Sequence, residues 1–355
     1  MVNKKFWQNK KVLITGNTGF KGSWCHFMLN ELGADVLGYS RGIPTNPSSY
    51  QEISKNLDLN TIYADILDRD ALKHAMDDFK PQIVIHMAAQ AIVKTSYLDP
   101  YDTFSTNVIG TLNIMEASKM SESTEVLINV TSDKCYENNE LNIAFKEEDR
   151  LGGKDIYSAS KACAEILANS YSESFLKESN SKLKIASVRA GNVIGGGDWS
   201  EERLIPDIIR SMKGEKLIIR NPEAIRPWQH VLDPIHGYLT LAMKLYSSND
   251  QEFVGGWNFG PNENSAKSVK WILDESSKYL QDLDYKQHDQ VSFKESHFLK
   301  LDSSKAKTKL DWYPVWDADK ALEKTIQWYL NYQIKKESTE CLMLNDIHSF
   351  WDKGI

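Results

Sequence analysis

The chain has few cysteines and no long apolar run. Its four cysteines, Cys25, Cys135, Cys163 and Cys341, lie far apart without a C-x-x-C pair, so neither a zinc site nor a disulfide framework is predicted. No apolar run approaches the ~18 residues of a membrane span. The basic N-terminal segment also lacks the apolar centre of a signal peptide. We therefore expect a cytoplasmic protein without a metal site or a membrane-spanning segment.

An excess of positive charge is also missing. Among 355 residues, 42 Lys and Arg stand against 49 Asp and Glu, and the formal net charge is -7. A nucleic-acid partner is therefore not expected. Hydrophobic residues make up 41% of the chain, enough for a sizeable core, and the length favours two domains or one large one.

A strand, three glycines and a helix open the chain in that order. Val12–Ile14 is an apolar run typical of a buried strand, Gly16, Gly19 and Gly22 follow at three-residue spacing, and residues 23–32 have helical periodicity. Such glycines allow a tight turn and close approach of the backbone to a pyrophosphate. The helix N-terminus offers its unpaired N–H groups to the phosphates. The pattern predicts a dinucleotide site; the alternative is an ordinary strand–turn–helix connection.

The segment YSASK places Tyr157 and Lys161 four residues apart. In a helix the two side chains share one face, one turn apart. A nearby ammonium favours the charged form of a phenol, and such a pair can take a proton from a sugar hydroxyl. On its own this spacing also fits a solvated helix face.

Strand-like and helix-like stretches alternate through the first half of the chain. This rhythm predicts an α/β fold, a Rossmann-type doubly wound parallel sheet with a smaller, interleaved C-terminal substrate domain. We assign residues 1–188 and a returning segment near 232–257 to the first domain, 189–335 mainly to the second, and 336–355 to a tail. The expected strands are 35–39, 82–87, 125–131 and 184–189, and the expected helices are 68–79, 100–118, 157–174, 234–246, 268–279 and 317–332.

Further motifs carry a family resemblance. With the glycine turn, the motifs HMAAQ (86–90), Asn107, TSDK (131–134) and YSASK (157–161) resemble, in this order, those of the extended short-chain dehydrogenase/reductases. More narrowly, FKGSW, TSDKCYEN, YSASKACAE, RAGNVIGGGDW and RPWQHV are similar to motifs of the CDP-glucose branch of the nucleotide-sugar 4,6-dehydratases. This similarity runs from about residue 11 to residue 332.

The resemblance implies a hydro-lyase that uses a tightly held NAD, reduced and reoxidised within one turnover. It implies CDP-glucose as the substrate and CDP-4-keto-6-deoxy-D-glucose as the product. That product feeds dideoxyhexose synthesis for surface polysaccharides such as the O-antigen of lipopolysaccharide. It also implies a homodimer or homotetramer, in which the helices at 100–118 and 157–174 form the interface.

The resemblance assigns the oxidation step to four residues of this sequence. Tyr157 would deprotonate the C4 hydroxyl, and Lys161 would hold the nicotinamide ribose. Ser132 would hydrogen-bond the C4 oxygen, and Asn107 would brace the active-site helix.

Asp133 and Lys134 distinguish a dehydratase from a plain oxidoreductase. Elimination of water after C4 oxidation needs a base at C5 and an acid at the C6 oxygen. The simplest assignment makes Asp133 the acid and Lys134 the base or a stabiliser of the enolate, and the sequence leaves open which of them takes the C5 proton. The alternative is a surface turn after a strand.

Substrate contacts follow from the same resemblance. Asn192 would reach the sugar or its phosphate, and Arg226 would clamp the pyrophosphate, a task suited to a guanidinium fork. The alternative for Arg226 is a surface arginine stacked on Trp228. Arg203, Asn262 and Lys94 are further expected contacts, and an exposed loop lysine is the other interpretation of Lys94.

The cofactor contacts include one departure from the usual pattern. NAD-specific Rossmann sites place Asp or Glu at the end of the second strand, but here that strand ends in Ser40 and Arg41. An arginine there could accept a 2′-phosphate, so NADP stays open beside the NAD that the family implies. Asp65 is the expected adenine contact, or a solvated loop aspartate. The other expected contacts are Thr18, Phe20, Ile66, Ala88, Ala89 and Gln90.

Two other functions fit part of this set of motifs. A 4-epimerase, a 4-ketoreductase or a dehydratase of another nucleotide sugar would share this fold, but an epimerase does not need the acid–base pair of TSDK. A non-catalytic NAD(P)-binding scaffold would not need Ser132, Tyr157 and Lys161 together.

Overall fold

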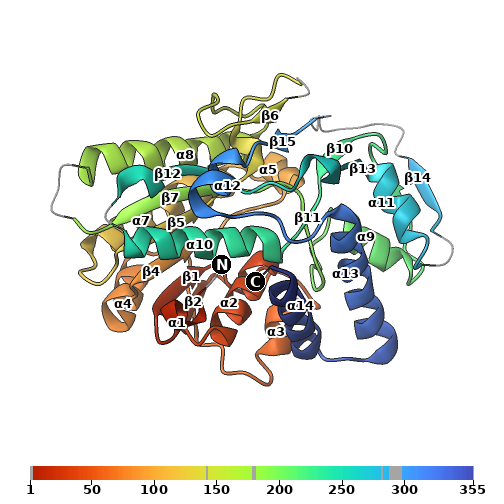
Figure 1. Cartoon of the computed structure of the whole chain (residues 1–355), viewed down its shortest axis with the longest axis horizontal. Helices are drawn as coiled ribbons and strands as arrows, with labels where there is room; N and C mark the ends of the chain where they lie inside the picture. Colours follow the sequence, from red (N-terminus) through yellow and green to blue (C-terminus); the bar gives the residue numbers. More distant parts are fainter. Residues whose placement is uncertain are drawn as a thin grey trace.

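A seven-stranded parallel sheet forms the centre of the protein (Figure 1). The computed structural model describes residues 3–140, 143–177, 181–248, 250–280, 283–287 and 298–354. The strand order is β12-β7-β5-β4-β1-β2-β3. The strands are β1 (Lys11–Thr15), β2 (Asp35–Ser40), β3 (Thr61–Tyr63), β4 (Ile83–His86), β5 (Val126–Val130), β7 (Lys184–Arg189) and β12 (Gly255–Asn258).

Helices cover both faces of this sheet, which is why its strands are apolar at successive positions. Val12 and Ile14 of β1 pack into a core with α2 (Phe20–Glu31) and α10 (Leu232–Ser247). Leu13, between them, points to the other face and joins a second core. The helices of that core are α4 (Arg69–Phe79), α7 (Gly110–Met120) and α8 (Ile156–Phe175). The doubly wound α/β fold predicted from the sequence is confirmed.

The stretch predicted as one helix at 100–118 contains a π-helical turn. It consists of α6 (Pro100–Phe104), the π turn η1 (Ser105–Ile109) and α7. A π turn inserts an extra residue into the helix and commonly marks a functional position. Here it contains the buried Asn107.

The chain leaves the sheet after β7 and returns to it twice. The helix α10 packs against β5, and β12 pairs with β7 as the edge strand. Before the first of these returns and after the second, the chain builds a separate lobe from short strands and helices. They are β8 (Val193–Ile194), α9 (Leu204–Ser211), β9 (Leu217–Ile219), β10 (Ile225–Pro227), β11 (Gln229–His230), β13 (Ala266–Ser268), α11 (Val269–Ser276), β14 (Tyr285–Gln287) and α13 (Ala318–Leu330).

The C-terminal segment, for which the sequence offered no motif, contains the helix α14 (Thr339–Gly354). It packs against α3 (Ser49–Ile53) beside the start of the sheet domain (Figure 1). Met343, Ile347 and Phe350 are buried, and Asp346 forms an ion pair with Lys324 of α13 at 3.1 Å. This helix therefore belongs to the packed structure.

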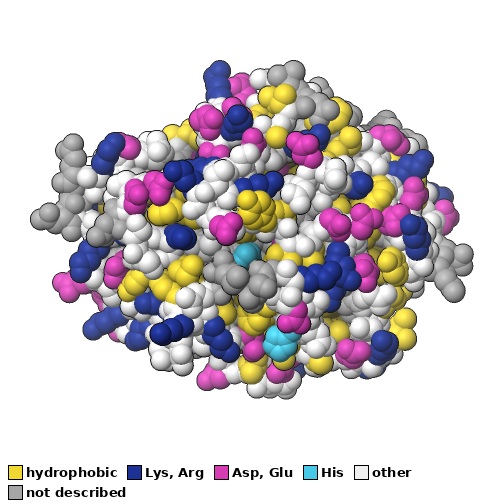
Figure 2. Space-filling model, in the orientation of Figure 1, with side chains coloured by type: hydrophobic (Ala, Val, Ile, Leu, Met, Phe, Trp, Pro, Cys, Tyr) yellow, Lys and Arg dark blue, Asp and Glu magenta, His cyan; other side chains and the backbone are white. Residues whose placement is uncertain are grey.

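The described residues form further short elements. They are α1 (Lys4–Trp7), α5 (Val93–Leu98), the 3-10 turn η2 (Asp133–Cys135), β6 (Ala144–Phe145), η3 (Gln251–Phe253), η4 (Glu263–Ser265), β15 (Lys300–Leu301), α12 (Ser304–Leu310) and the π turn η5 (Asn331–Lys335). Among the described residues, no helix combines the length and hydropathy needed to cross a membrane. Acidic and basic side chains are interspersed on the face shown in Figure 2.

Candidate active site

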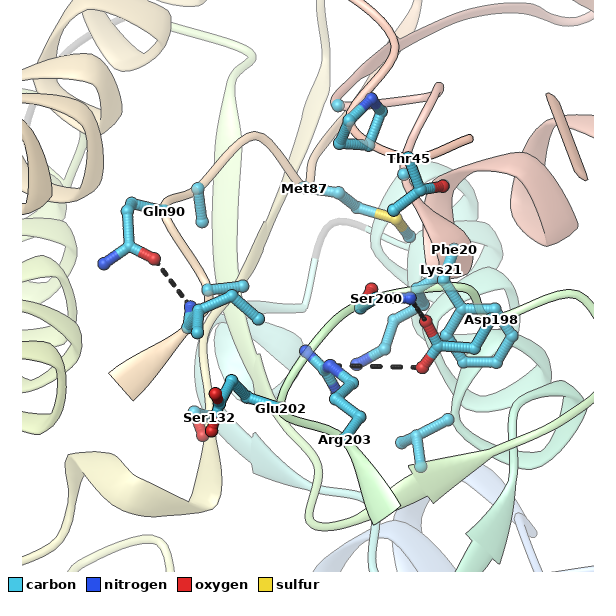
Figure 3. A pocket seen from close by; sticks show the side chains of 18 of the residues that line it. Phe20, Lys21, Thr45, Met87, Gln90, Ser132, Asp198, Ser200, Glu202 and Arg203 are labelled. Atoms are coloured by element: carbon cyan, nitrogen blue, oxygen red, sulfur yellow. Dashed lines mark hydrogen bonds and ion pairs between the residues drawn. The ribbon is translucent and has the colours of Figure 1, made fainter. Parts of the chain in front are cut away.

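A cavity of about 870 Å³ lies at the carboxyl ends of the central strands (Figure 3). Its wall comes from the glycine turn after β1, from 87–95 after β4, from 130–134 after β5 and from 190–207 after β7. In sheets of this topology, ligands bind beyond the carboxyl ends of the strands, where the strand order reverses. Here that reversal lies between β1 and β4.

The glycine turn fits an anion at the start of α2. Gly16 has a φ of +73°, and a Cβ there would lie 2.7 Å from the Ala88 nitrogen. A Cβ on Gly22 would lie 2.1 Å from the Gly16 oxygen, whereas one on Gly19 would meet only that oxygen, at 3.5 Å. Gly19 caps α2 without a side-chain hydrogen bond. The N–H groups of the first helical turn are therefore available to a dinucleotide diphosphate.

The end of β2 is arranged through contacts that the sequence did not reveal. The Ser40 hydroxyl is buried and donates to Asn17 Oδ1 at 2.8 Å. Arg41 is largely exposed, and its guanidinium lies 3.1 Å from Asp102 Oδ1 and 3.8 Å from Asp65 Oδ2. Asp65, in the loop after β3, and Asp102, on α6, thus place two carboxylates beside Arg41.

The loop after β4 is held by Asn107. Its Oδ1 accepts from the Gln90 N–H at 2.8 Å, and its Nδ2 donates to the Gln90 oxygen and to Ser160 Oγ. Ala88, Ala89 and Gln90 line the cavity, as do Thr18, Phe20 and Ile66. Asn107 does not itself line the cavity, but its hydrogen bond to Ser160 links this loop to α8.

Ser132, Asp133 and Lys134 follow β5 in one 3-10 turn at the cavity wall. The Ser132 hydroxyl donates to Asp133 Oδ1 at 3.0 Å. Asp133 is buried, and its Oδ2 has no hydrogen-bond partner among the described residues. Burial raises the pKa of Asp133, although Lys134, Ser132, Arg226 and Lys21 oppose the rise. The turn therefore presents a carboxyl group that holds its proton more readily than an exposed one.

Tyr157 and Lys161 lie one turn apart on α8, whose N-terminus is capped by Asp155. Burial raises the pKa of Tyr157 to about 12, while the Ser132 hydroxyl and Arg203 oppose it. Burial lowers the pKa of Lys161 to about 8, and its ammonium donates to the Val130 oxygen at 3.3 Å. Both side chains line the cavity beside Ser132.

Five of the six expected substrate residues line the same cavity: Ser132 and Lys94 come from the sheet domain, and the other three come from segments that follow β7. Asn192 and the buried Arg226 contribute to the wall, and Arg203 approaches Asp198 at 3.9 Å. Lys94 also lines it and pairs with Glu202 at 2.7 Å. Asn262 does not line the cavity; it is exposed and accepts from Lys307 at 3.4 Å.

Sequence reasoning missed five charged residues of the wall: Lys21, Asp198, Glu202, Asp207 and Arg220. Asp198 and Glu202 belong to a loop whose path no local pattern predicts. Lys21 did carry a signal, because it is a charged residue inside the glycine turn motif, next to Gly22.

The comparisons with known proteins agree with this geometry. A CDP-glucose 4,6-dehydratase of Salmonella typhimurium is 45% identical over 338 residues, which are 93% of each chain. A dTDP-glucose 4,6-dehydratase of Escherichia coli is 28% identical and covers 90% of this chain and 94% of its own.

Solved structures share the fold. An epimerase from Methanothermobacter thermautotrophicus superposes with a TM-score of 0.81 at 21% identity, over 94% of this chain and 96% of its own. A dTDP-glucose 4,6-dehydratase from Bacillus anthracis, solved in complex with NAD, gives a TM-score of 0.75 at 23% identity, over 91% and 97%. The family profile described as GDP-mannose 4,6 dehydratase matches residues 13–325. The chain therefore belongs to this family of nucleotide-sugar 4,6-dehydratases, which are hydro-lyases.

Proposed function

We propose that this protein dehydrates CDP-glucose to CDP-4-keto-6-deoxy-D-glucose, with NAD as its cofactor. The observation that carries the proposal is the buried Asp133 of raised pKa, held by Ser132 and followed directly by Lys134. A plain oxidoreductase or an epimerase does not need an acid beside its C4 base. The choice of CDP-glucose rests on the relative that is 45% identical.

The glycine turn and the first turn of α2 are the proposed cradle of the cofactor diphosphate. Gly19 leaves room there, and Asp65 and Ile66 line the adjacent wall. NAD bound at this place supplies a hydride acceptor for the hydrogen of C4 and a hydride donor for C6. Lys161 would hold the nicotinamide ribose, with Asn107 bracing α8 through Ser160.

Tyr157 is the proposed base for the C4 hydroxyl. Its phenol must lose a proton to act, and burial, together with the charges of Asp133 and Asp155, raises its pKa and opposes that loss. Ser132 and Arg203 favour the ionised form, and the Ser132 hydroxyl would also bind the C4 oxygen as the ketone forms. These contacts orient the hydroxyl for removal of its proton as the hydride departs.

Asp133 and Lys134 are the proposed acid–base pair of the elimination. The ketone at C4 acidifies the C5 proton, because the resulting carbanion delocalises into the carbonyl. Asp133 would give its proton to the C6 hydroxyl, which leaves as water. Lys134 is the proposed base or enolate stabiliser at C5, and the two cations Arg226 and Arg203, with Asn192, would hold the diphosphate.

The deciding experiment incubates the purified protein with CDP-glucose and NAD and identifies the product by mass and by NMR. A product one water lighter, with a C4 ketone and a C6 methyl group, is expected. A C4 epimer of unchanged mass would make the protein an epimerase, and a 4-keto product formed with a stoichiometric amount of NADH would make it a ketoreductase that runs here in the oxidative direction. Parallel reactions with dTDP-glucose, UDP-glucose and GDP-mannose test the base, and preference for one of them would overturn the choice of CDP-glucose.

The exposed apolar residues of two neighbouring helical stretches support a proposed homodimer, or a tetramer built from two. Leu98 and Tyr101 are 76% and 83% exposed before η1, and Ile166 is 51% exposed on α8. Burying such a surface between two copies would remove it from water. We place the enzyme in the cytoplasm, where its product would enter dideoxyhexose synthesis. Light scattering in solution tests the assembly.

A further inference from the structure

A buried ion pair joins α8 to the end of β7, and neither of its residues lines the cavity. Glu165 lies on α8, one turn after Lys161, and Arg189 is the last residue of β7. Arg189 donates from Nε and Nη2 to the two carboxylate oxygens of Glu165, at 2.9 and 2.8 Å. The side chains of Arg189 and Glu165 are 4% and 3% exposed. A bidentate pair of this kind fixes the orientation of the two elements that carry it.

The same ion pair holds the start of the segment 131–136, which follows β5 and contains the TSDK motif. The first residue of this segment, Thr131, is buried. Its hydroxyl donates to Glu165 Oε1, the closer acceptor, and lies 3.3 Å from the Val188 oxygen. Hydrogen bonds to an ionised carboxylate are stronger than those between neutral groups. Glu165 therefore fixes the point at which the 131–136 segment leaves the sheet.

Arg189 holds the other end of the 131–136 segment. The hydroxyl of the buried Tyr136 accepts from Arg189 Nη1 at 2.5 Å and donates to Asn258 Oδ1, on β12, at 2.8 Å. The guanidinium carbon also lies 4.9 Å from the centroid of the Tyr136 ring. A Cβ on Gly256 would lie 2.6 Å from Arg189 Nη2, so the glycine leaves room for the guanidinium. Both ends of the segment are thus bonded to two side chains that bond to each other.

The position of the Asp133 carboxyl depends on the backbone of this segment. Its Oδ1 accepts from Ser132, inside the segment, and its Oδ2 has no hydrogen-bond partner among the described residues. The Asp133 N–H donates to the oxygen of Ala190, the residue after Arg189, at 3.2 Å. Within the described part of the chain, no side chain outside the segment forms a hydrogen bond with this carboxyl. Whatever holds the two ends of the segment therefore sets the place of the carboxyl.

A contribution to stability alone does not account for the ion pair. Removing two charges from water is costly, and apolar side chains of similar volume often give equal or greater stability. The pair instead joins the elements that carry the proposed active groups. Its carboxylate is on the helix of Tyr157, its bonds hold the segment of Asp133, and its guanidinium is on the strand that leads to Asn192.

We propose that Glu165 and Arg189 are positioning residues, which act as one clamp on both ends of the 131–136 segment. The clamp sets the place of Ser132 and Asp133 relative to the phenol on α8. The inference rests on the proposed function, in which Ser132 serves the oxidation at C4 and Asp133 serves the elimination. Because both residues belong to the clamped segment, loosening it slows both steps.

Two variants each open the clamp at one end and keep both members of the ion pair. Thr131→Val removes the hydroxyl at the start of the segment, and Tyr136→Phe removes the hydroxyl at its end. Thr131→Ser keeps the hydroxyl. Thr325→Val is the matched control, because Thr325 is fully buried on α13, does not line the cavity and donates to the Ala321 oxygen at 2.8 Å.

The first test needs no substrate. Hydrogen–deuterium exchange with mass spectrometry measures how readily the N–H groups of 131–136 open to water. Exchange in this segment should become about tenfold faster in Thr131→Val and in Tyr136→Phe, the effect on an opening equilibrium of losing one such hydrogen bond. It should stay near the wild-type rate in Thr131→Ser and Thr325→Val. Unchanged exchange in either clamp variant, or an equal rise over the whole chain, would overturn the clamp.

The second test follows turnover of CDP-glucose. In Thr131→Val, kcat should fall by about 10²-fold, the cost of misplacing a reacting group by about 1 Å, while KM and NAD affinity stay near their wild-type values. Thr131→Ser should recover kcat, and Thr325→Val should keep it. A raised KM with unchanged kcat would make Thr131 a substrate contact, and a loss of kcat that Thr131→Ser does not recover would reduce it to a packing role. Either result overturns the proposal.

The two tests also separate the clamp from the proposed function. If the wild-type protein dehydrates no nucleotide sugar, the proposed function fails, while the exchange measurement still tests the clamp. If the wild-type protein forms the expected product and exchange in the 131–136 segment does not change in the clamp variants, the clamp alone fails.

Discussion

The two sides of the cavity are built in different ways. On the cofactor side, the wall consists of backbone: the glycine turn after β1, the start of α2 and the Ala88–Gln90 loop after β4. On the substrate side, the wall consists of charged and polar side chains on loops, such as Arg203 and Arg226, which come from segments that follow β7. One side offers N–H groups with a fixed geometry, and the other offers individual side chains.

This difference predicts different sensitivities to mutation. A backbone site is damaged by atoms that are added, since an extra Cβ takes the place of the ligand or pushes the turn apart. A side-chain site is damaged by atoms that are removed, since its contacts belong to single residues. Substitutions on each side therefore test whether the two walls differ in this way.

The largest effect is expected at the phenol of Tyr157, the proposed base for the C4 hydroxyl. Tyr157→Phe removes one oxygen from the cavity wall and leaves the glycine turn unchanged. Turnover should fall by about 10²–10⁴-fold, the usual contribution of a positioned acid–base group, while NAD affinity stays near the wild-type value. Steady-state kinetics and calorimetric titration of NAD measure both quantities. A variant of normal activity would transfer the role of C4 base to another residue.

The next effect is expected at Arg226. Arg226→Ala should weaken CDP-glucose binding by about 2–5 kcal/mol, the range for truncating one partner of a buried charge pair. NAD binding should not change, because Arg226 is proposed to hold the diphosphate of the substrate and not that of the cofactor. Titration with CDP-glucose and with NAD compares the two ligands, and Lys267→Ala, at the neighbouring position of β13, serves as a control. Equal losses for both ligands would contradict the division of the cavity.

Two alanine substitutions in the glycine turn separate an effect on the stability of the fold from an effect on NAD binding. Gly22→Ala would bring its Cβ to 2.1 Å from the Gly16 oxygen, so it should destabilise the fold by about 1–3 kcal/mol, as overpacking does. Gly19→Ala meets nothing closer than 3.5 Å and should leave stability intact while weakening NAD binding. Thermal unfolding with and without NAD separates the two effects. If both substitutions destabilised the fold equally, the proposal that Gly19 leaves room for the cofactor diphosphate would be contradicted.

The smallest effect is expected at Arg41. Its guanidinium is 64% exposed and shared between Asp102 and Asp65, and exposed pairs contribute about 0–1 kcal/mol. Arg41→Ala should therefore change neither stability nor NAD affinity measurably. Affinity for NADP is the informative measurement: a loss confined to NADP would show that Arg41 accepts a 2′-phosphate, and equal losses for NAD and NADP would show that it contacts a part common to both.

Much of the catalytic apparatus could be predicted because it is local in sequence. Tyr157 and Lys161 share a helix face by their spacing alone, and Asp133 and Lys134 follow an apolar strand that had to end at the cavity edge. The three-residue spacing of Gly16, Gly19 and Gly22 predicts a turn, because the geometry of a turn depends mainly on the residues within it. Such features need no knowledge of the rest of the chain.

The contacts that tune this apparatus were beyond prediction. An ammonium near Tyr157 was expected to favour the phenolate, but in the structure burial raises the pKa of Tyr157 to about 12, and Arg203, from a distant loop, is the cation that opposes it. Asn262, expected in the cavity, lies outside it. Both outcomes depend on where loops of the second lobe meet the sheet.

The sequence alone predicts the alternation of strands and helices, the glycine turn and the order of the proposed catalytic residues. Each of these features depends on residues that lie close together in the chain. The ion pairs between distant segments became apparent only from the fold: Arg41 with Asp65 and Asp102, and Lys94 with Glu202. Parallel strands are joined by long crossovers, so residues far apart in sequence reach one sheet edge only after the strand order is set. The burial that shifts their pKa values arises at that same step.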